Sequence, residues 1–97
     1  MIVSFRNRGT EDIFFQVDSR AARNLCPPQV WHIARRKLSM VDAAASIDKL
    51  KVPYGNRLEL LKKERAGQYA IRINDQYRVC FWWTDAGAKD VEITDYH

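Results

Sequence analysis

The last seven residues of the chain, VEITDYH, bring three side chains that can exchange protons to one end of the sequence. Asp95 can accept a proton, Tyr96 can donate or accept a hydrogen bond, and the imidazole of His97 changes protonation near neutral pH. A carboxylate such as Asp95 can also hold and orient a neighbouring imidazole or phenol. The alternative is that Tyr96 and His97 are surface residues at a chain end, where order is usually low.

Two cations elsewhere in the sequence, Lys62 and Arg78, have the charge that a phosphate-transfer reaction requires. Cleavage of RNA by its own 2′-hydroxyl needs a base for that hydroxyl, cations for the phosphorane and an acid for the leaving 5′-oxygen. The residue types therefore suit a metal-free ribonuclease. Each cation also has another interpretation, because Arg78 could pair with Glu92 or Asp90 across a sheet and Lys62 could discourage edge pairing at a strand end.

Length and charge fit one small domain, residues 1–97, with an acidic partner. Hydrophobic residues make up 46% and charged residues 29% of the chain, which is typical of a globular protein and not of a disordered one. The net charge is +4. Basic residues are concentrated between Arg20 and Lys37 and between Lys51 and Ala66, whereas Asp85–His97 is mainly acidic. This uneven distribution favours binding to a polyanion.

Other classes of protein find little support in the sequence. There is no apolar run of membrane-spanning or signal-peptide length, so we expect a cytoplasmic protein with no membrane contact. Cys26 and Cys80 lie far apart and outside any metal-ligand spacing, which predicts two reduced, buried thiols and neither a disulfide nor a zinc site. We expect neither a metal nor a small-molecule cofactor.

The first half of the chain predicts one strand and two helices. IVSF followed by RNRG predicts a strand over residues 2–6. TEDIFFQV predicts a helix with Thr10 as its N-cap and with Val17 still on its apolar stripe. Pro28 suits the first turn of a second helix, whose apolar stripe continues to Val41. Three basic residues fall off that stripe and are interpreted as a solvated helix face: His32, Arg35 and Arg36.

The second half predicts an antiparallel sheet. After the loop IDKLKVPYGN, RLELLKK predicts a strand, and QYAIRINDQYRVCFWW predicts two more strands. A three-residue hairpin loop, rather than a two-residue one, gives these two strands one wholly apolar face. It leaves Arg72, Arg78 and Cys80 on the other face, and the adjacent Trp82 and Trp83 must point in opposite directions. VEITDYH predicts the last strand, after a turn at TDAGAKD. The fold class is thus α+β, with two N-terminal helices packed on one face of a small, mainly antiparallel sheet.

Several segments resemble the HigB-type toxins, or plasmid-maintenance killer proteins, of the RelE/ParE superfamily. These segments are MIVSFRNRG, DAAASIDKL, RLELLKKERAGQYAIRINDQYRVCFWW and VEITDYH, and together they span the whole chain. The resemblance implies a RelE-like fold and a toxin of a type II toxin-antitoxin system. Such toxins enter the A site of the 70S ribosome, cleave messenger RNA during translation and arrest growth. It also implies a helix-turn-helix antitoxin of the HigA type as partner.

Residue by residue, the resemblance implies that Lys62 and Arg78 stabilise the phosphate and the transition state. Asp95, Tyr96 and His97 would complete a terminal catalytic group. The sequence departs from the family at Glu59, since RLELLK stands where better studied members have LHPLK. A carboxylate there could accept a proton but would repel an incoming phosphate. Glu59 is therefore either a catalytic residue or a residue without a catalytic role that faces solvent or forms an ion pair. Further RNA contacts are expected from Arg57, Lys63, Arg65, Arg72 and Trp82.

Two other functions fit the same fold. A ParE-like protein would poison DNA gyrase, and a degenerate member would be a binding module held by its antitoxin without activity. ParE-like chains lack the terminal Asp-Tyr-His, so that motif favours RNA cleavage. The departure at Glu59 is the sequence feature that favours the inactive module.

Overall fold

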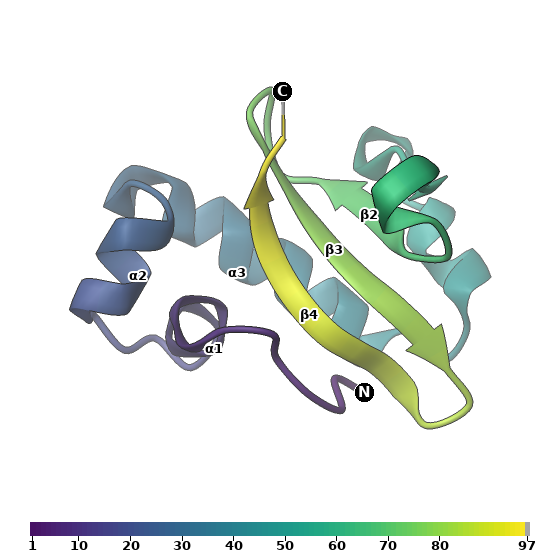
Figure 1. Ribbon diagram of the computed structural model, residues 1–97, viewed down its shortest axis with the longest axis horizontal. Coiled ribbons are helices and arrows are strands. Elements are labelled where there is room, and N and C mark those ends of the chain that lie inside the picture. Colours follow the sequence, from purple (N-terminus) through teal and green to yellow (C-terminus); the bar gives the residue numbers. More distant parts are fainter. Residues whose placement is uncertain (97) are drawn as a thin grey trace.

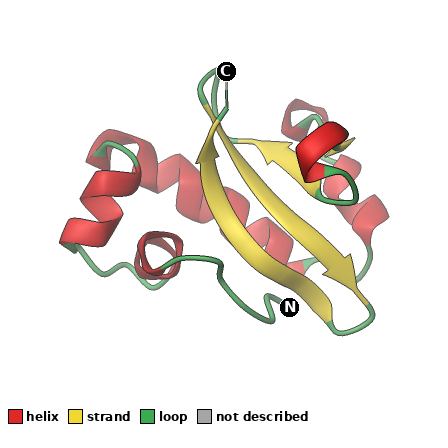
Figure 2. Cartoon of the chain, in the orientation of Figure 1, coloured by secondary structure: helices red, strands yellow, loops and turns green. Residues whose placement is uncertain are grey.

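The computed structural model describes residues 1–96, in which three helices precede a four-stranded sheet. The strands are all antiparallel and lie in the spatial order β1-β2-β3-β4. The third helix runs behind the sheet, against one of its faces, and the first two helices lie on the side of its edge strand β4 (Figures 1 and 2). The predicted α+β class is confirmed, although there are three helices and not two. The helices are α1 (Arg8–Phe14), α2 (Arg20–Leu25) and α3 (Pro28–Ala43), and the strands are β1 (Glu59–Leu60), β2 (Tyr69–Arg72), β3 (Tyr77–Thr84) and β4 (Gly87–Asp95).

Helix α1 begins earlier than predicted because Asn7, and not Thr10, is its N-cap. The Asn7 side chain accepts a hydrogen bond from the backbone N–H of Thr10 at 2.9 Å. Thr10 is fully buried inside the helix, and its hydroxyl oxygen accepts a hydrogen bond from the N–H of Ile93 in β4 at 3.0 Å. Val17 lies beyond the end of α1 and is exposed, so its placement on the apolar stripe was wrong.

Helix α2 was not predicted. Ser19 caps it, accepting a hydrogen bond from the N–H of Ala22 at 3.0 Å, and Ala22 is the buried residue of its six. A helix this short has too few apolar positions to show a 3.6-residue period. Cys26, which follows α2, and Cys80 in β3 are buried free thiols, as expected.

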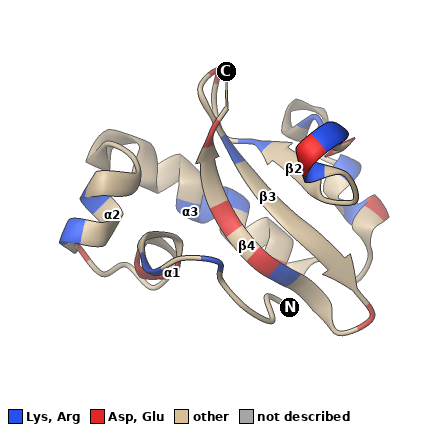
Figure 3. Cartoon of the chain, in the orientation of Figure 1, with Lys and Arg blue, Asp and Glu red and all other residues tan. Residues whose placement is uncertain are grey.

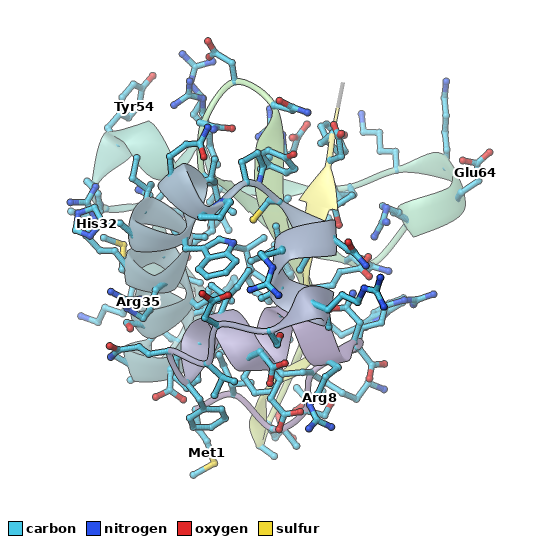
Figure 4. The ribbon with its side chains drawn as sticks, turned by 90° about the vertical axis from the view of Figure 1, so that its left-hand side faces the viewer. Met1, Arg8, His32, Arg35, Tyr54 and Glu64 are labelled. Atoms are coloured by element: carbon cyan, nitrogen blue, oxygen red, sulfur yellow. The ribbon has the colours of Figure 1, made fainter. Side chains whose placement is uncertain are left out.

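Helix α3 begins at Pro28 as predicted and packs its apolar stripe against the sheet. Leu38 and Val41 are fully buried, whereas His32 lies on the outer side of the helix (Figure 4). The stripe also includes Lys37, which the apolar pattern could not reveal: its side chain is buried, and Nζ donates to Oδ1 of Asn56 at 2.6 Å. Burial, followed by repulsion from Arg36 and Arg72, lowers the pKa of Lys37.

The hairpin between β2 and β3 has the predicted three-residue loop. Ile71 pairs with Val79, and the N–H of Ile73 donates to the carbonyl oxygen of Tyr77 at 2.9 Å. The apolar residues of both strands face the helices, and Phe81 is fully buried among them. The opposite face of the sheet remains open to solvent, except for a small second core around Ala70 and Cys80. The register prediction is therefore confirmed.

Two predicted strands are shorter or less regular than expected. Residues 2–6 form isolated parallel bridges to β4, where the N–H of Val3 donates to the carbonyl oxygen of Ala88 at 2.7 Å. This segment covers the outer edge of β4 in Figure 1. The strand expected from RLELLKK is reduced to two residues, because the backbone turns at Arg57 (φ 48°) and Lys63 (φ 60°).

The last strand begins at Gly87 and not at Val91. Gly87 has a φ of 128°, and a Cβ at this position would lie 2.1 Å from the carbonyl oxygen of Met1. The close approach of the N-terminal segment therefore requires glycine here. None of the helices formed by residues 1–96 has the length and apolarity needed to span a membrane.

Candidate active site

The C-terminal tyrosine is anchored on the open face of the sheet. Tyr96 packs against the second core of Leu61, Ala70 and Cys80. Its backbone N–H donates to the carbonyl oxygen of Gln76 at 2.6 Å, which continues the ladder between β3 and β4 by one residue. Tyr96 is half-buried. Tyr96 is thus held against the sheet, and its phenol lies on the face opposite the helices.

Arg78 lies directly beside this tyrosine. Its guanidinium carbon is 4.8 Å from the centre of the Tyr96 ring, within the range of a cation–π interaction. The alternative pairing of Arg78 with Glu92 or Asp90 is not observed among the described residues. Glu92 instead bonds to other arginines, and Asp90 accepts a hydrogen bond from Ser4. The Arg78 charge therefore has no carboxylate partner within residues 1–96.

Tyr96 and Lys62 line the same pocket, which has a volume of about 560 Å³. Lys62 lies just after β1, and its side chain is exposed. Because β1 is an edge strand, this position would also suit a lysine that discourages edge pairing. The pocket brings Lys62 and Tyr96 together. Its other lining residues are Arg6, Leu61, Lys63, Glu64, Arg65 and Gln68.

An ion-pair cluster forms one wall of this pocket. Glu92 in β4 is buried, and its two carboxylate oxygens bond to different arginines. Arg65 donates to Oε1 at 2.7 Å, and Arg6 lies 3.2 Å from Oε2. The hydrogen bond to Glu92 raises the pKa of Arg65. Arg65 is expected to contact RNA, but in the structure its guanidinium group forms an ion pair with Glu92.

A second pocket of about 900 Å³ lies on the other side of Arg78. Arg57, Glu59 and Arg78 line it, together with Lys51, Tyr54 and Leu58. The Glu59 side chain is exposed, and its Cα pairs with Ala70 in the β1–β2 ladder. The structure thus groups Glu59 with Arg57 and Arg78, while Tyr96 and Lys62 belong to the first pocket.

Asp95 is the last residue of β4 and lies beside the loop that joins β2 and β3. It is exposed, it accepts a hydrogen bond from Nε2 of Gln76 at 3.0 Å, and its Cα pairs with Tyr77. Burial and then the Asp95 charge raise the pKa of Tyr77. Successive residues of a strand point to opposite faces, so Asp95 and Tyr96 diverge. His97, the remaining member of the predicted terminal group, lies outside the described residues.

Two of the expected RNA contacts line neither pocket. Arg72 is bonded to Asp75 within the hairpin loop. Trp82 lies over Gly67, whose Cβ would be 2.7 Å from the indole Cζ3, whereas Trp83 packs into the main core. The opposite orientation of the two tryptophans is confirmed.

The charges are distributed unevenly over this face. Figure 3 shows acidic segments along β4 and basic segments in the turn before β2. That turn carries Lys62, Lys63 and Arg65, with Glu64 among them. The pocket-lining side chains missed by sequence reasoning include Arg6 and Gln68 in the first pocket and Lys51 and Tyr54 in the second. The sequence signal for Tyr54 is an aromatic residue between proline and glycine in a basic stretch, which the assignment of IDKLKVPYGN as a loop does not use.

Comparison with known proteins identifies the family. The family model described as a RelE-like toxin of the type II toxin-antitoxin system HigB matches residues 3–97. The chain is 36% identical to Toxin HigB-1 of Vibrio cholerae over 93 residues, which are 96% of this chain and 95% of that protein. It is also 38% identical to an uncharacterized protein of Haemophilus influenzae over 55 residues, which cover 57% and 54% of the two chains. A type II toxin implies an antitoxin as its partner. The chain belongs to the HigB-like toxins of type II toxin-antitoxin systems.

Proposed function

We propose that this toxin is a metal-independent endoribonuclease that cleaves messenger RNA in the A site of the ribosome. The observation that carries the proposal is the placement of the Arg78 guanidinium 4.8 Å from the centre of the Tyr96 ring, beside a pocket that Lys62 lines. This arrangement joins a cation and a phenol on the open face, where RNA can reach both. Ribosome binding would place the action in the cytoplasm, and the antitoxin would be of the helix-turn-helix HigA type.

The proposed reaction follows from these groups. A base takes the proton of the 2′-hydroxyl, whose oxygen attacks the adjacent phosphorus, and the bond from phosphorus to the 5′-oxygen breaks. Lys62 and Arg78 stabilise the extra negative charge of the phosphorane. Tyr96 and His97 are the candidates for moving the two protons, and Asp95 is the candidate for positioning the imidazole. Glu59 lines the same pocket as Arg78 and is a weaker candidate for the group that takes the 2′-hydroxyl proton.

The unpaired cations support RNA as the target. Lys62, Arg57 and Arg78 form no salt bridge within residues 1–96, so their charge is available to phosphates. Lys63 adds a further exposed cation to the first pocket. Contacts of this kind position a nucleic acid without reading its sequence.

The test is induced expression of the wild type and of variants in growing bacteria, with the 5′ ends of one abundant message mapped. We expect growth arrest and in-frame cuts from the wild type, and neither from His97→Ala. Arg78→Ala should slow cleavage by about 10²-fold or more if Arg78 stabilises the phosphorane. Arg35→Ala, a change on the outer side of α3, is the matched control for loss of one positive charge (Figure 4).

Four results would contradict parts of the proposal. Cleavage by His97→Ala would remove His97 from the mechanism. Equal losses from Arg78→Ala and Arg35→Ala would show that Arg78 acts only through the overall charge. Arrest with DNA breaks and no message cuts would indicate a gyrase poison, and rapid cutting of free RNA by the purified toxin would refute dependence on the ribosome.

A further inference from the structure

Tyr54 is an aromatic side chain whose position folding does not explain. Its exposed fraction is 92%, the highest among the large hydrophobic residues described. It lies on a one-turn 3₁₀ helix, Tyr54–Asn56, and projects outward from it in Figure 4. A ring that remains in water contributes almost nothing to the hydrophobic core. Its exposure therefore calls for another explanation.

The turn that carries Tyr54 is held from beneath. Asn56 is fully buried, with Oδ1 accepting from Nζ of Lys37 at 2.6 Å and Nδ2 donating to the carbonyl oxygen of Leu50 at 3.2 Å. The N–H of Arg57 donates to the carbonyl oxygen of Tyr54 at 3.1 Å, which closes the turn. The ring is thus presented by an anchored backbone, which lowers the entropic cost of binding a ligand.

Tyr54 forms part of the 900 Å³ pocket next to the proposed active site. Three cations line this pocket, Lys51, Arg57 and Arg78, against one acid, Glu59. Lys51 also forms an ion pair with Asp48 at 3.2 Å, in which both side chains are exposed, so a phosphate can compete for its charge. Arg78 is shared with the proposed active site, since its guanidinium lies over the Tyr96 ring. An exposed aromatic ring among cations is the combination that binds single-stranded nucleic acid, because the ring stacks on a base and the cations bind the backbone.

We propose that this pocket binds an unpaired nucleobase of the RNA strand, next to the phosphate that is cleaved. Tyr54 stacks on the base, and Lys51 and Arg57 bind the adjoining phosphates. An ionised carboxylate only accepts hydrogen bonds, and uracil offers it a single N3–H between two carbonyl oxygens that repel it. Glu59 therefore favours bases that carry an amino group, namely adenine, cytosine and guanine, over uracil. This inference rests on the proposed endoribonuclease activity and assigns that activity a base preference.

The experiment measures single-turnover cleavage by purified toxin on ribosomes paused on messages that differ in one nucleotide near the cut. Tyr54→Ala should slow cleavage by about 5- to 150-fold, the range expected for loss of one stacked base. Tyr54→Trp should restore most of the rate, because it keeps a stacking surface. Glu59→Gln should reduce the discrimination against uridine at one position, because an amide can also donate a hydrogen bond.

The matched control is Val52→Ala, two residues away. Val52 is 76% exposed and is not among the residues that line the pocket, so its truncation should leave the rate and the base preference unchanged. An unchanged melting temperature of each variant would show that the effects arise from binding. Because Tyr54 is exposed, its substitution should not disturb folding.

The outcomes separate this inference from the proposed function. A wild type that cleaves, together with a Tyr54→Ala variant of equal rate and preference, would overturn the base pocket alone. Equal cleavage with weaker antitoxin binding would show that Tyr54 contacts protein, and would also overturn it. If the wild type cleaves none of the messages, the endoribonuclease activity itself is refuted, and the base pocket with it.

Discussion

The buried carboxylate of Glu92 offers the sharpest test of the ion-pair cluster that forms one wall of the first pocket. The perturbation is Glu92→Gln, which keeps the shape of the side chain and removes its charge. Glu92 bonds to Arg65 at 2.7 Å and to Arg6 at 3.2 Å, and it accepts a hydrogen bond from Oγ1 of Thr94 at 3.3 Å. The substitution leaves both guanidinium groups without their counter-charge.

The magnitude follows from the exposure of each partner. The Glu92 side chain is 10% exposed, that of Arg65 33% and that of Arg6 59%. A hydrogen bond between charged groups in a buried site contributes about 1.5–3 kcal/mol, whereas an exposed ion pair contributes about 0–1 kcal/mol. We therefore expect Glu92→Gln to lower the free energy of unfolding by about 2 kcal/mol, most of it through Arg65. For a domain of this size the melting temperature should fall by roughly 8–16 °C.

The assay is urea unfolding in two double-mutant cycles, one joining Glu92→Gln with Arg65→Met and the other with Arg6→Met. The coupling energy should be about 1–2 kcal/mol for Arg65 and below about 0.5 kcal/mol for Arg6. A larger coupling with Arg6 would contradict the ranking by exposure. A Glu92→Gln variant within about 0.5 kcal/mol of the wild type would refute the reasoning as a whole.

Two further predictions concern a glycine and a buried thiol. Gly67 has a φ of 95°, and a Cβ added there would lie 2.7 Å from the Trp82 ring. Gly67→Ala should therefore lower the free energy of unfolding by about 2 kcal/mol and change the near-UV circular dichroism. Gly55→Ala is its control, because a Cβ there meets no atom within 4 Å, and an equal loss would show that the Trp82 contact is irrelevant. Burial raises the pKa of Cys26 from 9.0 to about 11, so between these values the unfolded thiol loses its proton while the folded one keeps it. The free energy of unfolding should fall by up to about 2–3 kcal/mol as the pH rises from about 9 to 11, and it should fall less in the Cys26→Ala variant. Urea unfolding of the two proteins over this pH range checks this prediction. An identical dependence of the unfolding free energy on pH in both proteins would contradict it.

The sheet was predictable from the sequence because one of its faces is buried. The alternation from Tyr69 to Trp83 admits one register that keeps polar side chains out of the core, and the three-residue loop follows from that register. The start of α1 was not predictable in the same way. Asn7 and Thr10 are both good N-caps, and only the position of β4, which engages the Thr10 hydroxyl, decides between them.

The composition of the site was partly predictable. Strand order and register bring Arg78, Tyr96 and the residues after β1 to one face, and those are local consequences of the hairpins. The partner of Arg65 was not predictable, because it depends on Glu92, 27 residues away in the sequence. The two pockets, and the separation of Glu59 from Tyr96, depend likewise on the turns at Arg57 and Lys63, which break the expected strand.

The structure divides the arginines and lysines of the open face into two groups. Arg6 and Arg65 are neutralised by Glu92, and Arg72 by Asp75, so these residues fix the fold and add little field toward solvent. The cations without a salt bridge among residues 1–96 include Lys62, Arg57 and Arg78, which line the two adjoining pockets. Positive charge that folding leaves uncompensated attracts phosphates, and each phosphate bound on a single strand contributes about −0.7 to the slope of log affinity against log salt. The modest net charge of +4 thus understates the local field, because Glu92 and Asp90 of β4 bond to Arg6, Arg65 and Ser4 and not to Lys62, Arg57 or Arg78.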